Sequence, residues 1–302
     1  MKYFYQINNL EKKETKFYDS NRKLISEDKL PKNIIKVAMG FPYAIIFYPP
    51  LDGKIYAYVI DQAGRKQYFY TKEYKEKMGE KKFKEFPKLI DKVDRLIDYC
   101  HTHKNDITTA IMLMNDCNFR IGHEKYKKLY DTNGTLTLNS RHIKKNKNKI
   151  SIEFFGKKKE KNFCSLKNKN TILYKTLDNF LDKKQKLLFT DLKYDDVYDF
   201  LKEYELRPKD IRQVSANREF YDLLRETKFE GDFKSQKETK KYLKQILVET
   251  SQNMNHTPTV CKKEYLMPQW FEFTGEKLEK LLNFVSKNNF NNSIEYIIKK
   301  NY

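Results

Sequence analysis

The sequence predicts an α+β protein: a small antiparallel β-rich N-terminal domain, then a larger, mainly α-helical C-terminal domain that contains a three-stranded sheet. Three observations support this prediction. At 302 residues the chain is near the length at which one hydrophobic core divides into two. Short β-branched and aromatic runs fill its first part, whereas apolar residues take helical spacing from about Phe83. A lysine-rich stretch with Gly79 lies between, so we predict domains over residues 1–76 and 83–302 and a basic linker over residues 77–82.

The N-terminal domain is predicted from three runs of strand-forming residues separated by Pro and Gly, over residues 34–37, 44–48 and 55–60. The third run leads into Asp61-Gln62-Ala63-Gly64, and the chain then returns over residues 65–70. Because Asp and Gly between two such runs are typical of a tight turn, we expect a β-hairpin here.

The C-terminal domain begins with an apolar stripe from Phe86 to Ile97, followed by a helix over residues 106–116 with Asp106 as its cap. We then expect a small sheet of strands over residues 135–138, 149–155 and 162–166, with a lysine-rich turn over residues 156–161. Further helices are predicted over residues 171–181, 194–204, 208–227, 236–254 and 276–299.

The chain is strongly basic, with 61 Lys and Arg against 41 Asp and Glu and a formal net charge of +20. Such a surplus attracts polyanions and releases counterions from a phosphate backbone, so nucleic acid is the leading partner. An A/T-rich coding sequence would raise the lysine count too, but it would not explain the shortage of acidic residues. No apolar run of about 18 residues could span a membrane, and the N-terminus is too polar for a signal sequence. We therefore expect a soluble intracellular or virion-borne protein.

The cysteines and acidic residues do not predict a metal site or disulfides. Cys100, Cys117, Cys164 and Cys261 are widely spaced and contain no Cys-x-x-Cys pair, which suits a reducing compartment. The cluster from Asp191 to Asp199 could hold Mg²⁺, but its spacing is more typical of a solvated helix face. No Gly-x-x-x-x-Gly-Lys-Ser/Thr motif indicates ATP. Chemistry on phosphate, if the protein performs it, is expected to need no nucleotide and no metal.

A set of residues in the last two-thirds of the chain has the chemical types that phosphodiester cleavage needs: Arg120, Lys157, Lys209 with Arg212, His256 and Tyr265. A tyrosine can attack phosphorus, and nearby cations favour its phenolate. Arginine forks match the oxygens of a phosphate, and a histidine can donate to one of them. A lysine at a turn can protonate a leaving oxygen, which typically contributes about 10²- to 10⁴-fold.

Each of these residues also has a structural interpretation. Tyr265 is one of 22 tyrosines, so it is more often a packing residue than a nucleophile. His256 could be a capping or core histidine, either arginine could lie at the surface, and Lys157 could be a solvated turn lysine beside Gly156. Only the ordered set is specific.

In that order the residues resemble the small poxvirus-type DNA topoisomerases of type IB, and the resemblance covers nearly the whole chain. It is carried by these segments: Phe119-Arg120-Ile121-Gly122, Phe154-Phe155-Gly156-Lys157, Lys209-Asp210-Ile211-Arg212, Asn255-His256-Thr257-Pro258 and Lys262-Lys263-Glu264-Tyr265. The resemblance implies that Tyr265 attacks one DNA strand to give a 3′-phosphotyrosyl enzyme. Arg120, Arg212 and His256 would stabilise the transition state, and Lys157, assisted by Lys209, would expel the 5′-hydroxyl.

The resemblance also implies contacts with DNA. The hairpin over residues 61–70 resembles one that touches bases, which nominates Gln67, Tyr68 and Tyr70; near the first arginine, the family pattern nominates His123 and Tyr126, and after the second, Asn217. Some positions depart from the family pattern. His123 replaces an expected lysine, Lys158 an expected aspartate, and Gln213-Val214-Ser215 the more usual Thr-Tyr-Gly. A pyrimidine-rich pentamer preference is therefore not expected to carry over.

Two alternatives remain. A tyrosine recombinase or integrase shares the Arg, Lys, Arg, His, Tyr order, but its second box normally reads His-x-x-Arg, and no core-binding helical domain precedes Arg120 here. A non-catalytic DNA-binding relative is the other. We expect a monomer that closes as a clamp around double-stranded DNA, with no cofactor and no ATP; Mg²⁺ is not required and could stimulate. The resemblance implies the virion and the host-cell cytoplasm, with a bacterial cytoplasm as the alternative.

Overall fold

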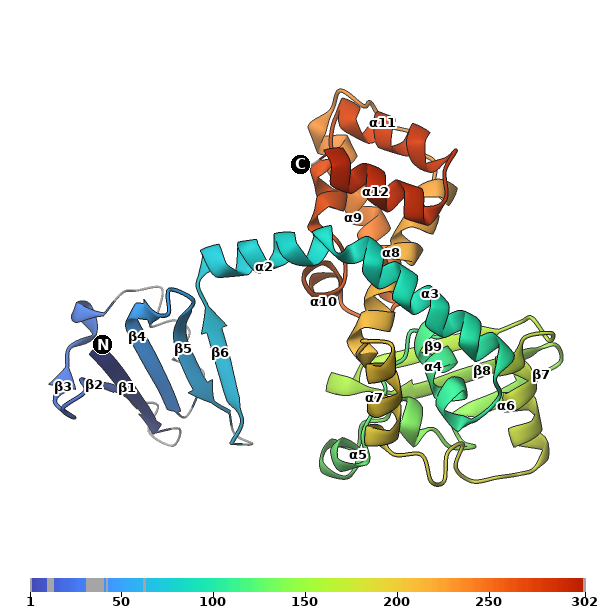
Figure 1. Ribbon diagram of the computed structural model, residues 1–302, viewed down its shortest axis with the longest axis horizontal. Helices are drawn as coiled ribbons and strands as arrows, with labels where there is room; N and C mark the ends of the chain where they lie inside the picture. The colour runs from blue at the N-terminus through green and yellow to red at the C-terminus, as the bar shows by residue number, and fades with distance from the viewer. Residues whose placement is uncertain (1, 10–13, 31–40, 42, 62–63, 301–302) are drawn as a thin grey trace. The chain divides into compact units, whose positions relative to one another are not determined.

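The computed structural model describes residues 2–9, 14–30, 41, 43–61 and 64–300. The chain divides into two compact units, Met1–Lys84 and Glu85–Tyr302, which Figure 1 shows in blue-to-cyan and green-to-red. The basic stretch that we predicted as a linker is helical, because it lies within α2, Lys72–Lys84. Its lysines and glutamates are good helix formers, and they outweigh the single glycine.

Among the described residues, the first unit contains an antiparallel sheet in the order β3-β2-β1-β4-β5-β6. Its strands are β1 (Lys2–Asn9), β2 (Glu14–Tyr18), β3 (Leu24–Ile25), β4 (Tyr43–Leu51), β5 (Ile55–Ile60) and β6 (Lys66–Tyr70). The predictions over residues 44–48 and 55–60 are confirmed by β4 and β5; the predicted strand over residues 34–37 lies outside the described residues. Alternate apolar side chains form the core, among them Phe17, Ile46 and Val59.

The turn between β5 and β6 depends on Asp61. Its carboxylate accepts from the Arg65 backbone amide at 2.9 Å, from Arg65 Nε at 2.9 Å and from Gln67 Nε2 at 3.2 Å. Gly64 follows with a φ of +74°, a conformation that glycine adopts without strain. This network confirms that the chain reverses here, and it holds Gln67 at the start of β6.

The second unit is built on three packed helices, α3 (Phe86–Thr102), α4 (Asp106–Asp116) and α8 (Pro208–Glu226). The apolar stripe of α3 is buried, as its spacing predicts. The cap of α4 is Asn105 rather than Asp106: the Asn105 side chain accepts from the Thr108 amide, and Thr108 Oγ1 accepts from the Asn105 amide. Because α4 is apolar on nearly every side, it lies at the centre of this unit.

The antiparallel sheet of the second unit has the order β7-β8-β9, with β7 over Ile143–Asn146, β8 over Lys149–Phe155 and β9 over Lys161–Leu166. The predicted strand over residues 135–138 is wrong. Thr135–Thr137 is a 3₁₀ turn, in which Thr137 Oγ1 accepts from the Gly134 amide at 3.0 Å. The third strand is β7, a polar segment whose only buried residue is Ile143. Helix α6 (Ile172–Asp182) packs on β7 and β8, and Figure 1 shows it along this sheet.

The remaining helices of the second unit are α5 (Glu124–Tyr130), α7 (Tyr194–Glu203), α9 (Gln236–Asn253), α10 (Pro258–Glu264), α11 (Glu276–Val285) and α12 (Phe290–Lys300). The single helix that we predicted over residues 276–299 is therefore two helices. The break falls at Ser286–Asn289, where Asn289 Oδ1 accepts from the Asn292 amide at 2.9 Å and starts a new helix. None of the helices in the described part of the chain is long and apolar enough to cross a membrane.

Candidate active site

Arg212 is the centre of the candidate site. It lies on α8 and is only 3% exposed. Its guanidinium donates to Asn118 O at 3.0 Å, to Met254 O at 3.3 Å and to Tyr265 Oη at 3.0 Å. These acceptors are neutral, so the buried charge has no carboxylate among them. Burial, together with the nearby charge of Arg120, lowers the pKa of Arg212 to about 10 against the opposing effect of Tyr265.

Tyr265 is held from both ends. Tyr265 is the C-cap residue of α10 and is 8% exposed, and its hydroxyl accepts a hydrogen bond from Arg212. Its backbone carbonyl accepts from Asn217 Nδ2 at 2.9 Å. Asn217 Oδ1 accepts from the Met267 amide at 3.0 Å and from Trp270 Nε1 at 2.9 Å. The segment after Tyr265 is therefore fixed by one buried side chain.

Asn217 is the predicted DNA-binding residue that does not fit that role. Its side chain is 0% exposed, and its amide is bonded to the backbone of Gln213 and Tyr265, to the Met267 amide and to Trp270. A side chain with this burial cannot reach a base or a phosphate. Asn217 lies on α8, five residues after Arg212, and its hydrogen bonds to the Tyr265 carbonyl and the Met267 amide assign it to positioning Tyr265 instead.

His256 contacts both Tyr265 and Arg212. Its ring stacks on Tyr265 at 4.3 Å between centroids, and its Nε2 is hydrogen-bonded to Arg212 Nη2. Burial, with the nearby charges of Arg212 and Arg120, lowers the pKa of His256 to about 2. Since an arginine only donates, Nε2 of the neutral ring accepts and the proton sits on Nδ1. Nδ1 is buried and has no partner among the described residues, so it is a donor without an acceptor.

Arg120 approaches the same cluster from a different segment. No hydrogen bond joins the described side chains of Arg120 and Tyr265, but the charge of Arg120 lowers the pKa of both Arg212 and His256. Its backbone is held tightly: Arg120 O accepts from the Thr135 amide at 2.9 Å. Gly122 and Gly134 cross so closely that a Cβ on Gly134 would lie 2.6 Å from Gly122 Cα and 2.7 Å from Arg120 O. Only glycine fits at Gly134, and this crossing fixes the path of the chain at Arg120.

The two predicted lysines are placed differently. Lys209 is near Tyr265, with Nζ 5.5 Å from the Tyr265 ring centroid, but it forms an ion pair with Glu264 at 2.6 Å. Lys157 lies in the turn Lys157–Lys159 between β8 and β9; it is exposed and has no ion-pair or hydrogen-bond partner within the described ranges. The structure therefore brings Arg212, His256 and Tyr265 into contact, with Lys209 beside them, and leaves Lys157 outside.

The other predicted DNA contacts lie at the surface or close to it. Tyr68 is 48% exposed on β6, where Gln67 bonds to Asp61 and Tyr70 is half-buried. Tyr126 on α5 is 43% exposed, and His123 caps this helix by accepting from the Lys125 amide at 3.0 Å. These positions leave the aromatic side chains accessible to a ligand. Their contacts with DNA stay predictions.

The prediction of no disulfide is wrong. Cys117 and Cys164 are bonded, with their Cα atoms 5.2 Å apart although 47 residues separate them in sequence. Cys117 ends α4 just before Arg120, and Cys164 lies in β9, after the turn of Lys157. Sequence spacing could not reveal this pair, because the two cysteines meet only when β9 packs beside the end of α4. Cys100 and Cys261 are free and buried.

Asn255 joins the same segments by hydrogen bonds, and sequence reasoning missed this role. Its Oδ1 accepts from the Phe163 amide at 2.8 Å, and its Nδ2 donates to Cys117 O at 3.4 Å. Its φ is +53°, in the left-handed region that asparagine tolerates better than most residues. The residue directly before His256 thus ties the histidine turn to β9 and to the end of α4.

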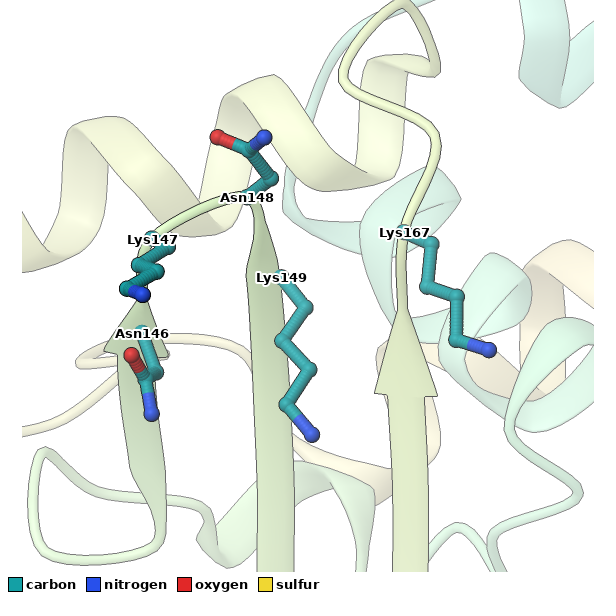
Figure 2. A pocket seen from close by; sticks show the side chains of 5 residues that line it. All are labelled: Asn146, Lys147, Asn148, Lys149 and Lys167. Carbon is teal, nitrogen blue, oxygen red and sulfur yellow. The ribbon is translucent and has the colours of Figure 1, made fainter.

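No cluster of three or more His, Cys, Asp or Glu side chains that could hold a metal occurs among the described residues. A shallow pocket lies at the end of β8 opposite Lys157. It is lined by Asn146, Lys147, Asn148, Lys149 and Lys167 (Figure 2). None of the six predicted catalytic residues lines this pocket. The candidate site is instead a buried arginine in contact with Tyr265 and His256, an arrangement that suits an anion with several oxygens.

Comparisons with known proteins identify the family of this chain. A family model of the eukaryotic DNA topoisomerase I catalytic core matches residues 71–289. DNA topoisomerase 1 of Rabbit fibroma virus (strain Kasza) is 30% identical over 248 residues, 79% of this chain and 77% of the relative. DNA topoisomerase 1B of Vaccinia virus (strain Copenhagen) is 29% identical over 79% and 77% of the two chains, and that of Acanthamoeba polyphaga mimivirus 22% over 94% and 89%. The chain belongs to the DNA topoisomerase I family.

Proposed function

We propose that the protein relaxes supercoiled double-stranded DNA as a type IB topoisomerase, by transient cleavage of one strand. The Tyr265 hydroxyl loses its proton and attacks a backbone phosphorus, and the bond to the 5′-oxygen breaks. The products are a 3′-phosphotyrosyl enzyme and a 5′-hydroxyl, which takes up a proton. The free end rotates about the intact strand, and reversal of the attack reseals the duplex. The bond energy is stored in the phosphotyrosine, so the cycle needs no ATP.

The observation that carries this proposal is the direct contact of Arg212 with Tyr265, beside His256. A buried guanidinium that donates to the hydroxyl stabilises the phenolate, which is the attacking form. Its other acceptors are neutral, so a phosphate would supply the missing negative charge. Arg120 would add a second cation, and neutral His256 could donate its unpartnered Nδ1 proton to a nonbridging oxygen after a rotation of its ring. Such preorganised donors favour the more highly charged transition state.

Lys157 is the proposed general acid, assisted by Lys209. Lys157 is exposed and has no ion-pair or hydrogen-bond partner among the described residues, so it is available to enter a groove of bound DNA and reach the leaving oxygen. To contact DNA, Lys209 would have to break its ion pair with Glu264. This is feasible because both side chains are exposed, 45% for Lys209 and 56% for Glu264. Exposed ion pairs are weak, typically about 0–1 kcal/mol, so phosphate can compete for the lysine.

Both units would contact one duplex, as a monomeric clamp. Each unit offers an exposed aromatic residue at a predicted contact position, Tyr68 in the first and Tyr126 in the second. We expect relaxation to persist in EDTA, because arginines and lysines can carry the phosphate charge; Mg²⁺ is not required and could stimulate turnover. The viral relatives favour action in the virion and in the cytoplasm of the infected cell.

The decisive variant is Tyr265→Phe, which removes only the hydroxyl. Wild type is expected to form a covalent adduct with a labelled duplex and to relax a plasmid in EDTA without ATP, whereas the variant should do neither. Its affinity for duplex should stay within about twofold, because phosphate contacts elsewhere supply most of the binding. A wild-type protein that binds duplex but forms no adduct would favour the non-catalytic alternative. Strand exchange between two duplexes, in place of relaxation, would favour a recombinase.

A further inference from the structure

The disulfide of the second unit lies beside the candidate active site, and the proposed cleavage chemistry makes no use of it. Cys117 is the C-cap residue of α4, and Cys164 lies in β9. The residue after Cys117 is Asn118, whose carbonyl accepts from Arg212 Nε at 3.0 Å. The Asn118 side chain also donates to Asn253 O at 3.3 Å. The position of Cys117 therefore affects an acceptor that orients the buried arginine.

The second cysteine is adjacent to the contacts of the histidine turn. Phe163, the residue before Cys164, donates its amide to Asn255 Oδ1 at 2.8 Å, and Asn255 directly precedes His256. Asn255 Nδ2 donates to Cys117 O at 3.4 Å, which is long for a hydrogen bond and therefore weak. The disulfide adds a covalent link between the same two segments. Opening it would leave only non-covalent contacts such as this one to hold the end of α4 against β9.

The two remaining cysteines are protected from thiol chemistry. Cys100 and Cys261 are free and 0% exposed. Burial raises the pKa of each thiol to about 12, so little of the reactive thiolate forms. Cys117 and Cys164 are 3% and 8% exposed, so Cys164 is the more accessible member of the bonded pair. A thiol from solution is therefore expected to react with the pair, and first at Cys164.

We propose that the Cys117–Cys164 pair is a redox modification site that sets the rate of DNA cleavage: cleavage is fast with the bond closed and slow after a dithiol has opened it. This rests on the proposed function for the reaction that is slowed. One thiolate of the dithiol attacks Sγ of Cys164, which forms a mixed disulfide and releases Cys117 to take up a proton. The second thiol then closes the disulfide of the reductant and releases Cys164. Two electrons and two protons pass to the protein, and oxidised glutathione reverses the exchange.

Reduction should affect the chemical step more than DNA binding. Arg120 follows Cys117 by three residues, and Asn118 contacts Arg212, so both arginines of the candidate site depend on the end of α4. A displacement of about 1 Å in an active site can cost about 10²-fold in rate. The hydrogen bonds of Asn255 persist in the reduced protein, so we expect a smaller loss, about 10-fold in single-turnover cleavage. Duplex affinity should change little, because phosphate contacts elsewhere supply most of it.

The test uses the whole chain, equilibrated with oxidised glutathione or with dithiothreitol, at a temperature at which circular dichroism shows both forms folded. Alkylation after denaturation should count two thiols in the oxidised protein and four in the reduced protein. Single-turnover cleavage of a labelled duplex at saturating protein then gives the rate of the chemical step. Hydrogen exchange is a second readout that needs no activity. The amides of Phe163 and His256, bonded to Asn255 Oδ1 and Ser251 O, should exchange faster after reduction.

The test variant is Cys117→Ala with Cys164→Ala, which removes the site. It should cleave at the rate of the reduced wild type and should not respond to dithiothreitol. The matched control is Cys100→Ala with Cys261→Ala, which keeps the bonded pair, so its ratio of oxidised to reduced rates should equal that of wild type. Oxidised glutathione added to the reduced wild type should restore the fast rate, which irreversible unfolding would not allow.

Equal cleavage rates in the two thiol states of wild type would overturn the proposal. So would a Cys117→Ala and Cys164→Ala variant that cleaves as fast as the oxidised protein, or a wild type that keeps four thiols in oxidised glutathione. Loss of the thiol response in the control variant would place the redox site elsewhere and reject this pair. Absence of adduct in both states would reject the proposed function. Hydrogen exchange would then decide the redox site: faster exchange at Phe163 and His256 after reduction would support it, and unchanged exchange would reject it.

Discussion

Replacement of Asn255 by glycine should test whether the hydrogen bonds around the candidate site hold it together. Glycine adopts the φ of +53° at no cost, so the substitution removes the side chain and leaves the backbone unstrained. Two groups then lose their partner: the Phe163 amide, bonded at 2.8 Å, and Cys117 O, bonded at 3.4 Å. The side chain is 8% exposed, so water does not readily replace it.

The magnitude follows from these two bonds. An unsatisfied buried donor costs about 1–3 kcal/mol, and the longer bond to Cys117 contributes less. We expect Asn255→Gly to lose about 2 kcal/mol of unfolding free energy, a fall in Tm of about 4–8 °C for a unit of this size. Because His256 is the next residue and a displacement of about 1 Å can cost about 10²-fold, single-turnover cleavage should slow by about 10- to 100-fold.

The assay pairs thermal denaturation with single-turnover cleavage of a labelled duplex at saturating protein. Asn255→Asp keeps an acceptor for the Phe163 amide and should recover part of both effects. Asn253→Ala is the control, because it lies two residues earlier and its side-chain amide donates to Glu219 at an exposed position. A glycine variant with the Tm and cleavage rate of wild type would refute the reasoning, since the side chain would then hold nothing in place.

Other outcomes follow from the same contacts. Gly134→Ala would place a Cβ 2.7 Å from Arg120 O, so it should lower Tm and slow cleavage with little change in duplex affinity, as measured by anisotropy. The pKa of His256 is about 2 in the folded protein and near 6.5 in the unfolded chain, so at intermediate pH the unfolded chain binds one more proton. The stability that neutral His256 contributes is therefore complete above about pH 6.5 and is lost as pH falls. His256→Asn should therefore flatten the decline of the unfolding free energy between pH 7 and 5, by up to about 1.4 kcal/mol per pH unit, as measured by denaturant unfolding. Removal of the Cys117–Cys164 bond, which closes a separation of 47 residues, should cost up to about 4 kcal/mol; a Tm unaffected by dithiothreitol would contradict this.

Local patterns in the sequence predicted much of the fold. β4 and β5 and the apolar stripe of α3 follow from side-chain alternation and helical spacing, which depend on neighbouring residues alone. The errors occur where longer-range packing decides. Thr135–Thr137 forms a turn because the Thr135 and Leu136 amides donate to Arg120 O and Ile121 O. β7 becomes a strand although it is almost wholly polar. The predicted linker is helical because strong helix formers surround Gly79.

What the sequence by itself determined is the set of reactive groups and their order, from Arg120 to Tyr265, together with a charge of +20 that favours a phosphate partner. Tertiary structure alone decided how these groups meet. It placed the hydroxyl of Tyr265 on Arg212, stacked His256 against the same ring and withdrew Asn217 into the interior. The physical reason is that the groups in contact come from separate elements, so their distances depend on how α8, the turn after α9 and α10 pack, and no spacing along the chain records that packing.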